Sequence, residues 1–275
     1  MNSLTSPYFK MSGKRIHIKP VLENIQGGSW EPTNWEQVYD NILKMRENRS
    51  APVDTMGCER SHDSTAPPAV QRFQCLVSLM LSSQTKDEIN FAAMTKLRAH
   101  GLTVQNILDT SDEKLGELIY PVGFWKRKVA YIKETSKVLL EKYNSDIPDT
   151  VEDLCSLKGV GPKMAYICMN VAWGKPTGIG VDTHVHRIAG RLGWTEKECS
   201  NPEATRKALE SWLPQSSLYR WIEINWLLVG FGQQICVPVG PKCGDCLNRD
   251  ICPVGRNWVL SPKKKSSPIK RIMKD

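Results

Sequence analysis

The sequence predicts an all-α protein whose helices are joined by short loops. Apolar residues recur at intervals of three and four along most of the chain, as in helices that bury one face. No segment shows the alternation of apolar and polar residues that a half-buried strand requires. The best strand candidate, Trp226 to Val229, continues the helical period of its flanks. No apolar run approaches the roughly 18 residues that a membrane span needs.

The first expected helices follow from these apolar faces and from the residues that end them. Val38, Ile42 and Met45 share one face of a helix expected over 35–49. The stretch 50–68 is rich in Pro, Ser and Asp and is expected to be a loop. An amphipathic helix then runs from Val70 to near 82–85, and the next is expected from about Lys86 to just before Gly101.

The remaining expected helices follow in order. Short helices at 104–108 and 115–119 precede a long one at 124–143. Helices at 151–157 and 163–173 flank a glycine-rich turn. Three more apolar faces predict helices over 182–192, 203–213 and 218–231.

The charge is concentrated at one end of the chain. The net charge is +8, and residues 257–275 hold six basic residues and one acidic residue, which leaves only +3 for the rest. We expect 257–275 to be a basic tail and 1–29, which is weakly patterned, to be a flexible leader. Because the body is only mildly basic, a nucleic-acid role must rest on particular residues rather than on overall charge.

Lys163 is expected at the start of a helix, directly after the turn Gly159-Val160-Gly161-Pro162. Glycine permits unusual backbone geometry, and proline fits the first helical position. The positive end of the helix dipole disfavours an ammonium group and so favours a free amine, the form that acts as a nucleophile. The turn also presents backbone N–H groups that suit a phosphate. The alternative is a solvated lysine at an ordinary corner between helices.

Four of the nine cysteines fall within 17 residues, and no secretion signal precedes them, which favours metal binding over disulfides. They are Cys236, Cys243, Cys246 and Cys252. Structural zinc sites usually combine two close pairs, whereas this loop has one, so we expect a [4Fe–4S] cluster, with zinc or four free thiols as alternatives. Three basic residues near the loop either meet phosphates or are simply solvated: Lys242, Arg249 and Arg256.

Asp182 precedes the segment Thr183-His184-Val185-His186 and suits the N-cap of the helix expected there. A carboxylate near an amine nucleophile has a second use, because it can accept a proton or stabilise a cationic intermediate. His184 and His186 are two residues apart and do not share a helical face. We therefore expect both histidines to pack or form hydrogen bonds rather than bind a metal.

Three of these features together carry a family resemblance. The hairpin from Leu157 to Ala165, the segment Val181 to His184 and the cysteine spacing resemble the endonuclease III family of DNA glycosylases. The segments Leu79 to Asp87 and Pro121 to Trp125 are similar to the eukaryotic branch of that family. The resemblance spans roughly residues 30–256 and leaves out both ends of the chain.

The resemblance implies two helical domains with a DNA cleft between them. A helical barrel domain with the helix–hairpin–helix motif would cover 66–175, and a cluster domain would combine 30–65 with 176–256. Lys163 takes the place of the nucleophile, Asp182 that of the catalytic carboxylate, and the four cysteines those of the cluster ligands. Gly159, Val160 and Gly161 would grip the DNA backbone.

The resemblance also places two residues in the DNA duplex. Gln84 aligns with the residue that fills the space left by a flipped base, and Phe124 lies near a second wedge position. The alternative for Phe124 is a core aromatic.

The implied function is a bifunctional DNA glycosylase and abasic-site lyase. It would remove oxidised pyrimidines through a lysine Schiff base and cut the strand by β-elimination. A monofunctional adenine-mismatch glycosylase, a non-catalytic damage-binding protein and a zinc-dependent DNA-binding regulator are the alternatives. The expected partner is duplex DNA, and no membrane association is expected. The chain is expected to act as a monomer. The expected compartment is the nucleus, with the mitochondrion as the second candidate.

Overall fold

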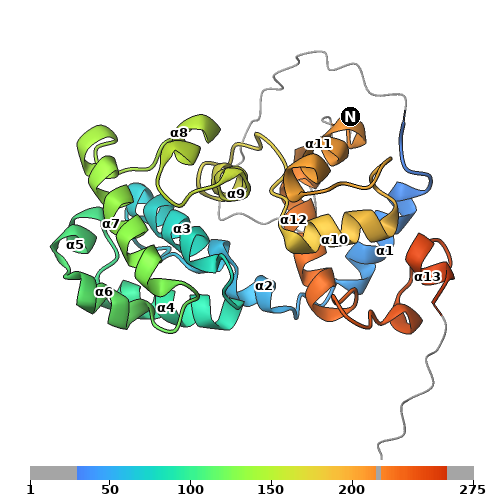
Figure 1. The fold of residues 1–275 in the computed structure, drawn as a ribbon, viewed down its shortest axis with the longest axis horizontal. Helices are drawn as coiled ribbons and strands as arrows, with labels where there is room; N and C mark the ends of the chain where they lie inside the picture. The colour runs from blue at the N-terminus through green and yellow to red at the C-terminus, as the bar shows by residue number, and fades with distance from the viewer. Residues whose placement is uncertain (1–29, 215–217, 259–275) are drawn as a thin grey trace, which may run out of the picture.

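The computed structural model describes residues 30–214 and 218–258, and within these ranges every regular element is helical (Figure 1). The all-α prediction is confirmed. The predicted leader 1–29 lies outside the described residues, as does all of the predicted basic tail except Asn257 and Trp258. No helix in the described ranges is long and apolar enough to cross a membrane.

The first lobe is built from seven consecutive helices around one apolar core. They are α3 (Pro68–Ser82), α4 (Asp87–His100), α5 (Val104–Asp109), α6 (Asp112–Ile119), α7 (Trp125–Lys142), α8 (Val151–Ser156) and α9 (Pro162–Ala172). Phe73, Leu76, Met94 and Leu139 are among its fully buried side chains. Helix α3 lies at the centre, where it packs against α4, α7 and α9.

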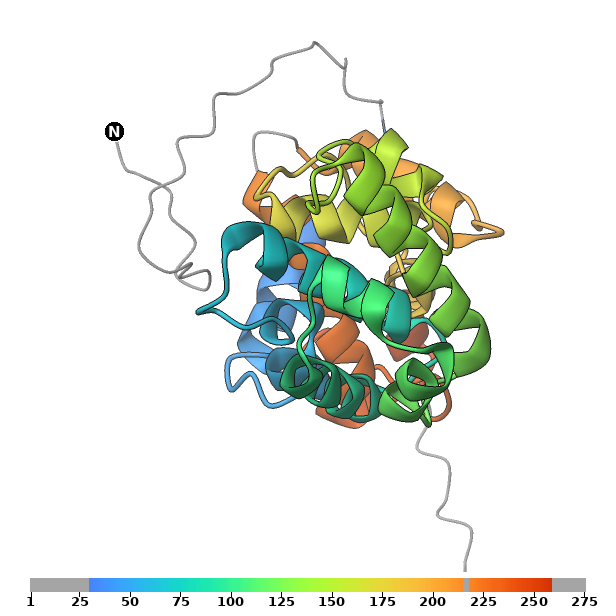
Figure 2. The same cartoon turned by 90° about the vertical axis from the view of Figure 1, so that its left-hand side faces the viewer.

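The second lobe joins one early helix to the C-terminal part of the chain. It contains α1 (Trp35–Met45), α10 (Thr183–Leu192), α11 (Pro202–Trp212), α12 (Leu218–Gln234), the 3₁₀ turn η3 (Cys243–Asp245) and α13 (Pro253–Arg256). Its core is rich in tryptophan: Trp212 lies 5.2 Å from Trp35 and 5.8 Å from Trp194 between ring centroids. Figure 2 views the molecule with the first lobe in front of the second.

The stretch 50–68 differs from the expected loop, because it contains α2 (Pro52–Met56) and the 3₁₀ turn η1 (Cys58–Arg60). Both elements are too short to show a helical period in the sequence. The preceding helix is also shorter than predicted: it ends at Met45, the backbone leaves the helical conformation at Arg46, and Arg49 has a φ of +44°. The Arg46 side chain meets Asp54, 2.7 Å between Nη2 and Oδ1.

Helix α2 lies between the lobes and packs against both α4 and α12 (Figure 1). The Val53 N–H donates to the Gln233 side chain at 3.1 Å, and the Gln233 amide donates to Asp87 at 2.7 Å. The second connection, residues 173–182, is held by the Ile179 N–H, which donates to Glu210 at 2.8 Å, and by the Asn225 amide, which donates to the Gly180 carbonyl at 2.7 Å. Both connections are therefore fixed by side-chain hydrogen bonds.

The two cores draw on residues 73–169 and on 35–42 together with 179–252. Cys58 packs against the first core, although it lies in the stretch 30–65 that was expected to belong to the second domain. The domain boundaries themselves stay a prediction.

Candidate active site

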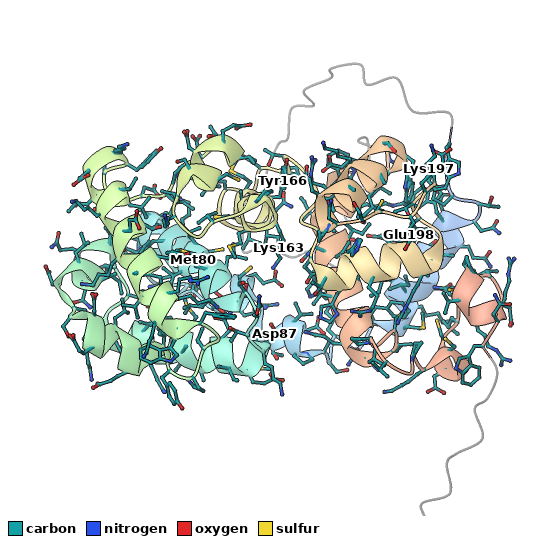
Figure 3. All side chains as sticks on the ribbon, viewed as in Figure 1. Met80, Asp87, Lys163, Tyr166, Lys197 and Glu198 are labelled. Atoms are coloured by element: carbon teal, nitrogen blue, oxygen red, sulfur yellow. The ribbon has the colours of Figure 1, made fainter. Side chains whose placement is uncertain are left out.

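Lys163 is the second residue of α9, as the sequence predicts. The turn before it is closed by the Val160 N–H, which donates to the Leu157 carbonyl at 3.1 Å, and by the Val160 side chain, which is buried in the first core. Val160 therefore anchors the turn rather than offering its own amide. Lys163 is half-buried, and Figure 3 shows it on the side of the first lobe that faces the second, with Tyr166 on the same helix.

Gly159 and Gly161 differ in backbone conformation and in how much space a side chain would have. Gly159 has a φ of +81°, and a Cβ there would lie 2.4 Å from the Tyr131 ring. Gly161 has an ordinary φ of −111°, and a Cβ there would meet no atom within 4 Å. Gly161 is the N-cap of α9, where glycine is well tolerated, and its missing side chain leaves the start of the helix open to the outside.

Asp182 is the N-cap of α10, on the second lobe. Its Oδ1 accepts a hydrogen bond of 2.9 Å from the Val185 N–H. The predicted capping role is thereby confirmed, and it uses one carboxylate oxygen. Capping leaves the second carboxylate oxygen of Asp182 available, and the predicted catalytic role of Asp182 stays a prediction.

Lys163 and Asp182 act on the same neighbours although they come from different lobes. Burial lowers the pKa of His184, and Asp182, Arg187, Asp87 and Lys163 modulate that pKa electrostatically. Burial likewise raises the pKa of Asp87, the first residue of α4, against the opposing effects of its Gln233 hydrogen bond, of Lys163 and of His184. The amine and the two carboxylates therefore lie within electrostatic range of the His184 imidazole, and we call these four groups the charge cluster.

The two histidines bond as expected from the sequence. His184 Nδ1 lies 3.2 Å from the Arg187 guanidinium, and His186 Nδ1 lies 2.7 Å from the Thr205 hydroxyl. A Cβ on Gly232 would lie 2.7 Å from His184 Nδ1, so α12 packs tightly against this imidazole. Both side chains are thus fixed within the second lobe.

Gln84 and Phe124 share an unusual backbone conformation. Their φ values are +51° and +55°, a region that costs a non-glycine residue on the order of 1–3 kcal/mol. Phe124 is 60% exposed, so the alternative of a core aromatic is wrong. Both residues border a pocket whose wall includes Arg127, Tyr131 and Gly159; we call it the hairpin pocket. Two strained residues and the glycine hairpin thus meet at one surface.

Three thiols lie close to the helix of Lys163. Cys75 on α3 and Cys168 on α9 are buried, as predicted for core residues, and Cys58 packs beside them. Hydrogen bonding to Cys75, together with burial, raises the pKa of Cys58 well above its usual range, while nearby Lys163 acts in the opposite direction. The hydrogen bond with Cys168, together with burial, also raises the pKa of Cys75, so Cys58 and Cys75 are poor thiolate nucleophiles.

The four clustered cysteines line one pocket between η3, α13 and the ends of α10 and α12. Cys243 and Cys252 are buried, while Cys236 and Cys246 are half-buried. Much of the remaining wall is apolar, with Leu192, Phe231 and Val254. The four side chains thus border one pocket, and their predicted role as ligands of one metal centre stays a prediction. The three basic residues near the loop are all exposed, which fits either alternative given for them: Lys242, Arg249 and Arg256.

The chemistry of this donor set suits a thiophilic metal centre, because four thiols line one pocket. Within 30–214 and 218–258, no group of three or more His, Cys, Asp or Glu side chains is arranged to hold a metal ion. Around a zinc ion four thiolates meet at one centre, whereas each iron of a [4Fe–4S] cluster takes its own thiolate. Four thiols can serve either group, and the choice of a [4Fe–4S] cluster stays a prediction.

Helix α10 connects this cysteine pocket to Asp182. Arg191, in its last turn, donates to the carbonyls of Val237 and Pro238 at 2.8 and 2.7 Å, and its Nη1 lies 3.4 Å from Cys236 Sγ. The Cys252 thiol in turn lies 3.4 Å from the Arg191 carbonyl. The carboxylate and the cysteine pocket thus occupy opposite ends of one helix.

Sequence reasoning missed two residues of this site. Asp87 is recognisable only in three dimensions, because it meets Lys163 and Gln233 through contacts between distant segments. Lys128 had a local signal: it lies four residues before Ile132 on the buried face of α7, where a lysine is unusual. Its side chain is only 6% exposed, and its surroundings are described below.

Comparison with known proteins gives a family match for this geometry. The HhH-GPD superfamily base excision DNA repair proteins match residues 77–215. A Gallus gallus protein named "Endonuclease III-like protein 1" is 58% identical over 257 residues, covering 92% of this chain and 90% of its own length. The Bos taurus protein of the same name is 57% identical over 234 residues, covering 85% of this chain and 76% of its own length.

The fold is also similar to a solved endonuclease III. The structure described as a "Trapped Endonuclease III-DNA Covalent Intermediate: Estranged-Adenine Complex" superimposes with a TM-score of 0.68 at 26% identity. The match covers 80% of this chain and 95% of that protein. The alignment therefore spans nearly the whole of that protein and most of this chain.

We expect Gly161→Ala to fold normally but to bind duplex DNA about tenfold more weakly, a change of about 1.4 kcal/mol. The added methyl has open space inside the protein but lies where a phosphate would approach the start of α9. Gly159→Ala is the contrasting control, because its methyl meets Tyr131 and its φ is positive, so it should lower the unfolding temperature. Unchanged DNA affinity for Gly161→Ala at matched salt would contradict the assignment.

We expect Cys243→Ser to abolish the broad absorbance near ~400 nm that a cysteine-ligated cluster gives, and to reduce solubility. Cys199→Ser is the matched control, because Cys199 lies outside the cysteine pocket and should leave the spectrum intact. Iron, sulfide and zinc analysis of the purified wild-type chain checks the metal. Stoichiometric zinc with no iron would show that the cluster assignment is wrong.

Proposed function

Because this chain belongs to the HhH-GPD superfamily of base excision DNA repair proteins, on its endonuclease III-like branch, we propose that Lys163 is the nucleophile of its reaction. The chain is a base excision repair DNA glycosylase and lyase. We propose oxidised pyrimidines in duplex DNA, and abasic sites, as its substrates. The observation that carries the assignment is the position of Lys163 at the start of α9, in one charge cluster with Asp182 and Asp87.

DNA would lie in a cleft between the two lobes, across the hairpin and the hairpin pocket. The open approach to Gly161 and the first turn of α9 supports a phosphate contact that holds the backbone without reading sequence. Because the chemistry takes place at the sugar, the damaged nucleotide must leave the stack. Gln84 and Phe124, both exposed at the hairpin pocket, would fill the vacated space.

The reaction begins when the free Lys163 amine attacks C1′ of the deoxyribose. The bond from C1′ to the base breaks, and the base leaves with a proton. The sugar ring opens to give an imine between Lys163 and C1′, which makes the C2′ proton acidic. Loss of that proton expels the oxygen on C3′, and the strand is cut 3′ to the lesion.

Asp182 would assist these reaction steps as a carboxylate near the positive charge that develops on the sugar. It would stabilise positive charge at the sugar and exchange protons with the amine. Asp87 lies in the same charge cluster and adds a second negative charge to it. The raised pKa values of Cys58 and Cys75 make these two thiols poor competitors of the amine as nucleophiles.

We propose that Cys236, Cys243, Cys246 and Cys252 hold a [4Fe–4S] cluster. When bound, it cross-links four points of one loop and takes no part in the sugar chemistry described above. The residues of this chain then do the remaining work: Arg191 ties the loop to α10, and α10 carries Asp182.

The alternatives are not favoured. A monofunctional glycosylase does not need a nucleophilic lysine at the start of α9, where Lys163 lies. A non-catalytic damage-binding protein needs neither Lys163 nor a carboxylate such as Asp182 near it. We propose that the chain works as a monomer on nuclear DNA, with mitochondrial DNA as the second candidate. The segments that would decide the compartment, the leader and the basic tail, lie almost entirely outside the described residues.

We expect borohydride to link the wild-type chain covalently to DNA that contains an oxidised pyrimidine, because reduction of the imine gives a stable amine. Lys163→Gln should bind the same DNA yet give no linked product and no strand cleavage. Glutamine is a good helix former and leaves the backbone amides of the hairpin in place. Lys158→Gln removes a charge from the same hairpin and should still be trapped. Trapping that persisted in Lys163→Gln would place the nucleophile elsewhere.

We expect Asp182→Asn to lose at least ~100-fold in turnover while DNA binding is largely kept, as is typical when a proton-transfer group is removed. Asparagine caps a helix about as well as aspartate, so the hydrogen bond from Val185 should survive and the fold should be unchanged. Single-turnover kinetics together with thermal unfolding separates the two roles. A near-normal rate would leave Asp182 with its capping role alone.

A further inference from the structure

Lys128 is a cation inside the first lobe. It lies on the face of α7 that also buries Val129 and Ile132, and its side chain is 6% exposed. Burial lowers its pKa to about 8, so keeping the ammonium form there is unfavourable relative to keeping it in water. An apolar side chain of the same length would fill this position without that penalty, so packing alone does not account for the lysine.

The ammonium group binds one short stretch of chain, the turn after α3. Its Nζ donates to the carbonyls of Leu81 and Ser83 at 2.7 and 2.6 Å and to the Thr85 hydroxyl at 3.2 Å. The carbonyls at the end of a helix lack partners within the helix and carry partial negative charge. Lys128 therefore closes α3 from the side and fixes the residues on both sides of Gln84.

The same turn is joined to the loop that carries Phe124. The Gly123 N–H donates to the Thr85 hydroxyl at 3.2 Å. A Cβ on Gly123 would lie 2.4 Å from the Gln84 carbonyl, so glycine is required for the two loops to approach. Gln84 and Phe124, the two exposed residues with positive φ in these loops, are thus linked through Thr85 and Lys128.

We propose that Lys128 is a positioning residue for base excision, because its ammonium locks the turn 81–85 to the loop 121–124 and thereby presents Gln84 and Phe124 to the DNA as one rigid unit. This inference rests on the proposed function, since the two wedges matter only if a base is flipped out of a duplex. Lys128 itself would touch neither the sugar nor the base. Its contribution would be to the opening of the duplex rather than to the chemistry of the imine.

The test compares Lys128→Met with Lys133→Met. Methionine keeps the apolar stem of Lys128 and removes its three hydrogen bonds. Lys133 is a matched control on the same helix: it also binds two helix-end carbonyls, those of Leu108, at 2.9 Å, and Thr110, but at α5, away from both wedges. Each variant is measured on an intact lesion in duplex DNA and, by borohydride trapping, on a preformed abasic site, where no base has to be moved.

We expect Lys128→Met to excise the intact lesion at least ~10-fold more slowly in a single turnover, because a loss of about 1.4 kcal/mol in the free energy of base opening lowers the population of the opened state tenfold. Trapping at the abasic site should stay within about threefold of wild type, because the lysine chemistry is untouched. A 2-aminopurine placed next to the lesion should report less base opening. Lys133→Met should match the wild type in all three measurements.

Two results would overturn the inference: wild-type excision by Lys128→Met, or an equal loss on the lesion and on the abasic site, which would indicate a structural role alone. If Lys128→Met does not fold, Thr85→Val removes only the hydroxyl that joins the two loops, and it should show the same selective loss in weaker form. Failure of the wild-type chain to be trapped on either DNA would instead count against the proposed function.

Discussion

The buried ion pair between Arg46 and Asp54 ties the end of α1 in the second lobe to α2, the helix that lies between the lobes and packs against both. The two side chains are 1% and 3% exposed, and their closest atoms lie 2.7 Å apart. Arg46 follows α1 in the second lobe and also donates to Gln234 of α12, while Asp54 belongs to α2, which packs against the first lobe. Breaking one partner of such a pair typically costs about 3–5 kcal/mol. Because the amine and the carboxylate sit on opposite lobes, their meeting depends on this joint.

Much of the fold could be predicted from the sequence because most helices are long enough to show a regular pattern of apolar residues along one buried face. The apolar positions of 70–82 and 124–143 predict α3 and α7 within two residues at each end. Helix α2 could not be found in this way, since five residues show no period and Arg46–Asp54 is a tertiary contact. The same holds for the site. Lys163 and the neighbouring glycines could be recognised from local sequence, whereas Asp87 accepts its hydrogen bond from Gln233 only when the two lobes are assembled.

The hairpin pocket gathers several departures from ordinary local preference. Gln84, Phe124 and Gly159 have positive φ, and Lys128 is a buried cation. Each feature is unfavourable or unexplained in isolation, and natural sequences concentrate such conflicts at functional surfaces. Sequence rules identify residues that follow the helical pattern of apolar positions. Lys128 breaks that pattern on the buried face of α7, and this mismatch was the only sequence signal for it.

Helix α10 also determines how a disturbance in one part of the second lobe would reach another. Nine residue steps, about 14 Å of helix, separate Asp182 at its start from Arg191, which binds the carbonyls of the cysteine loop. The helix packs against both α11 and α12, so it would move as one body rather than bend. A displacement of the cysteine loop would therefore be transmitted over this distance to the carboxylate, and the positions of the two are set together.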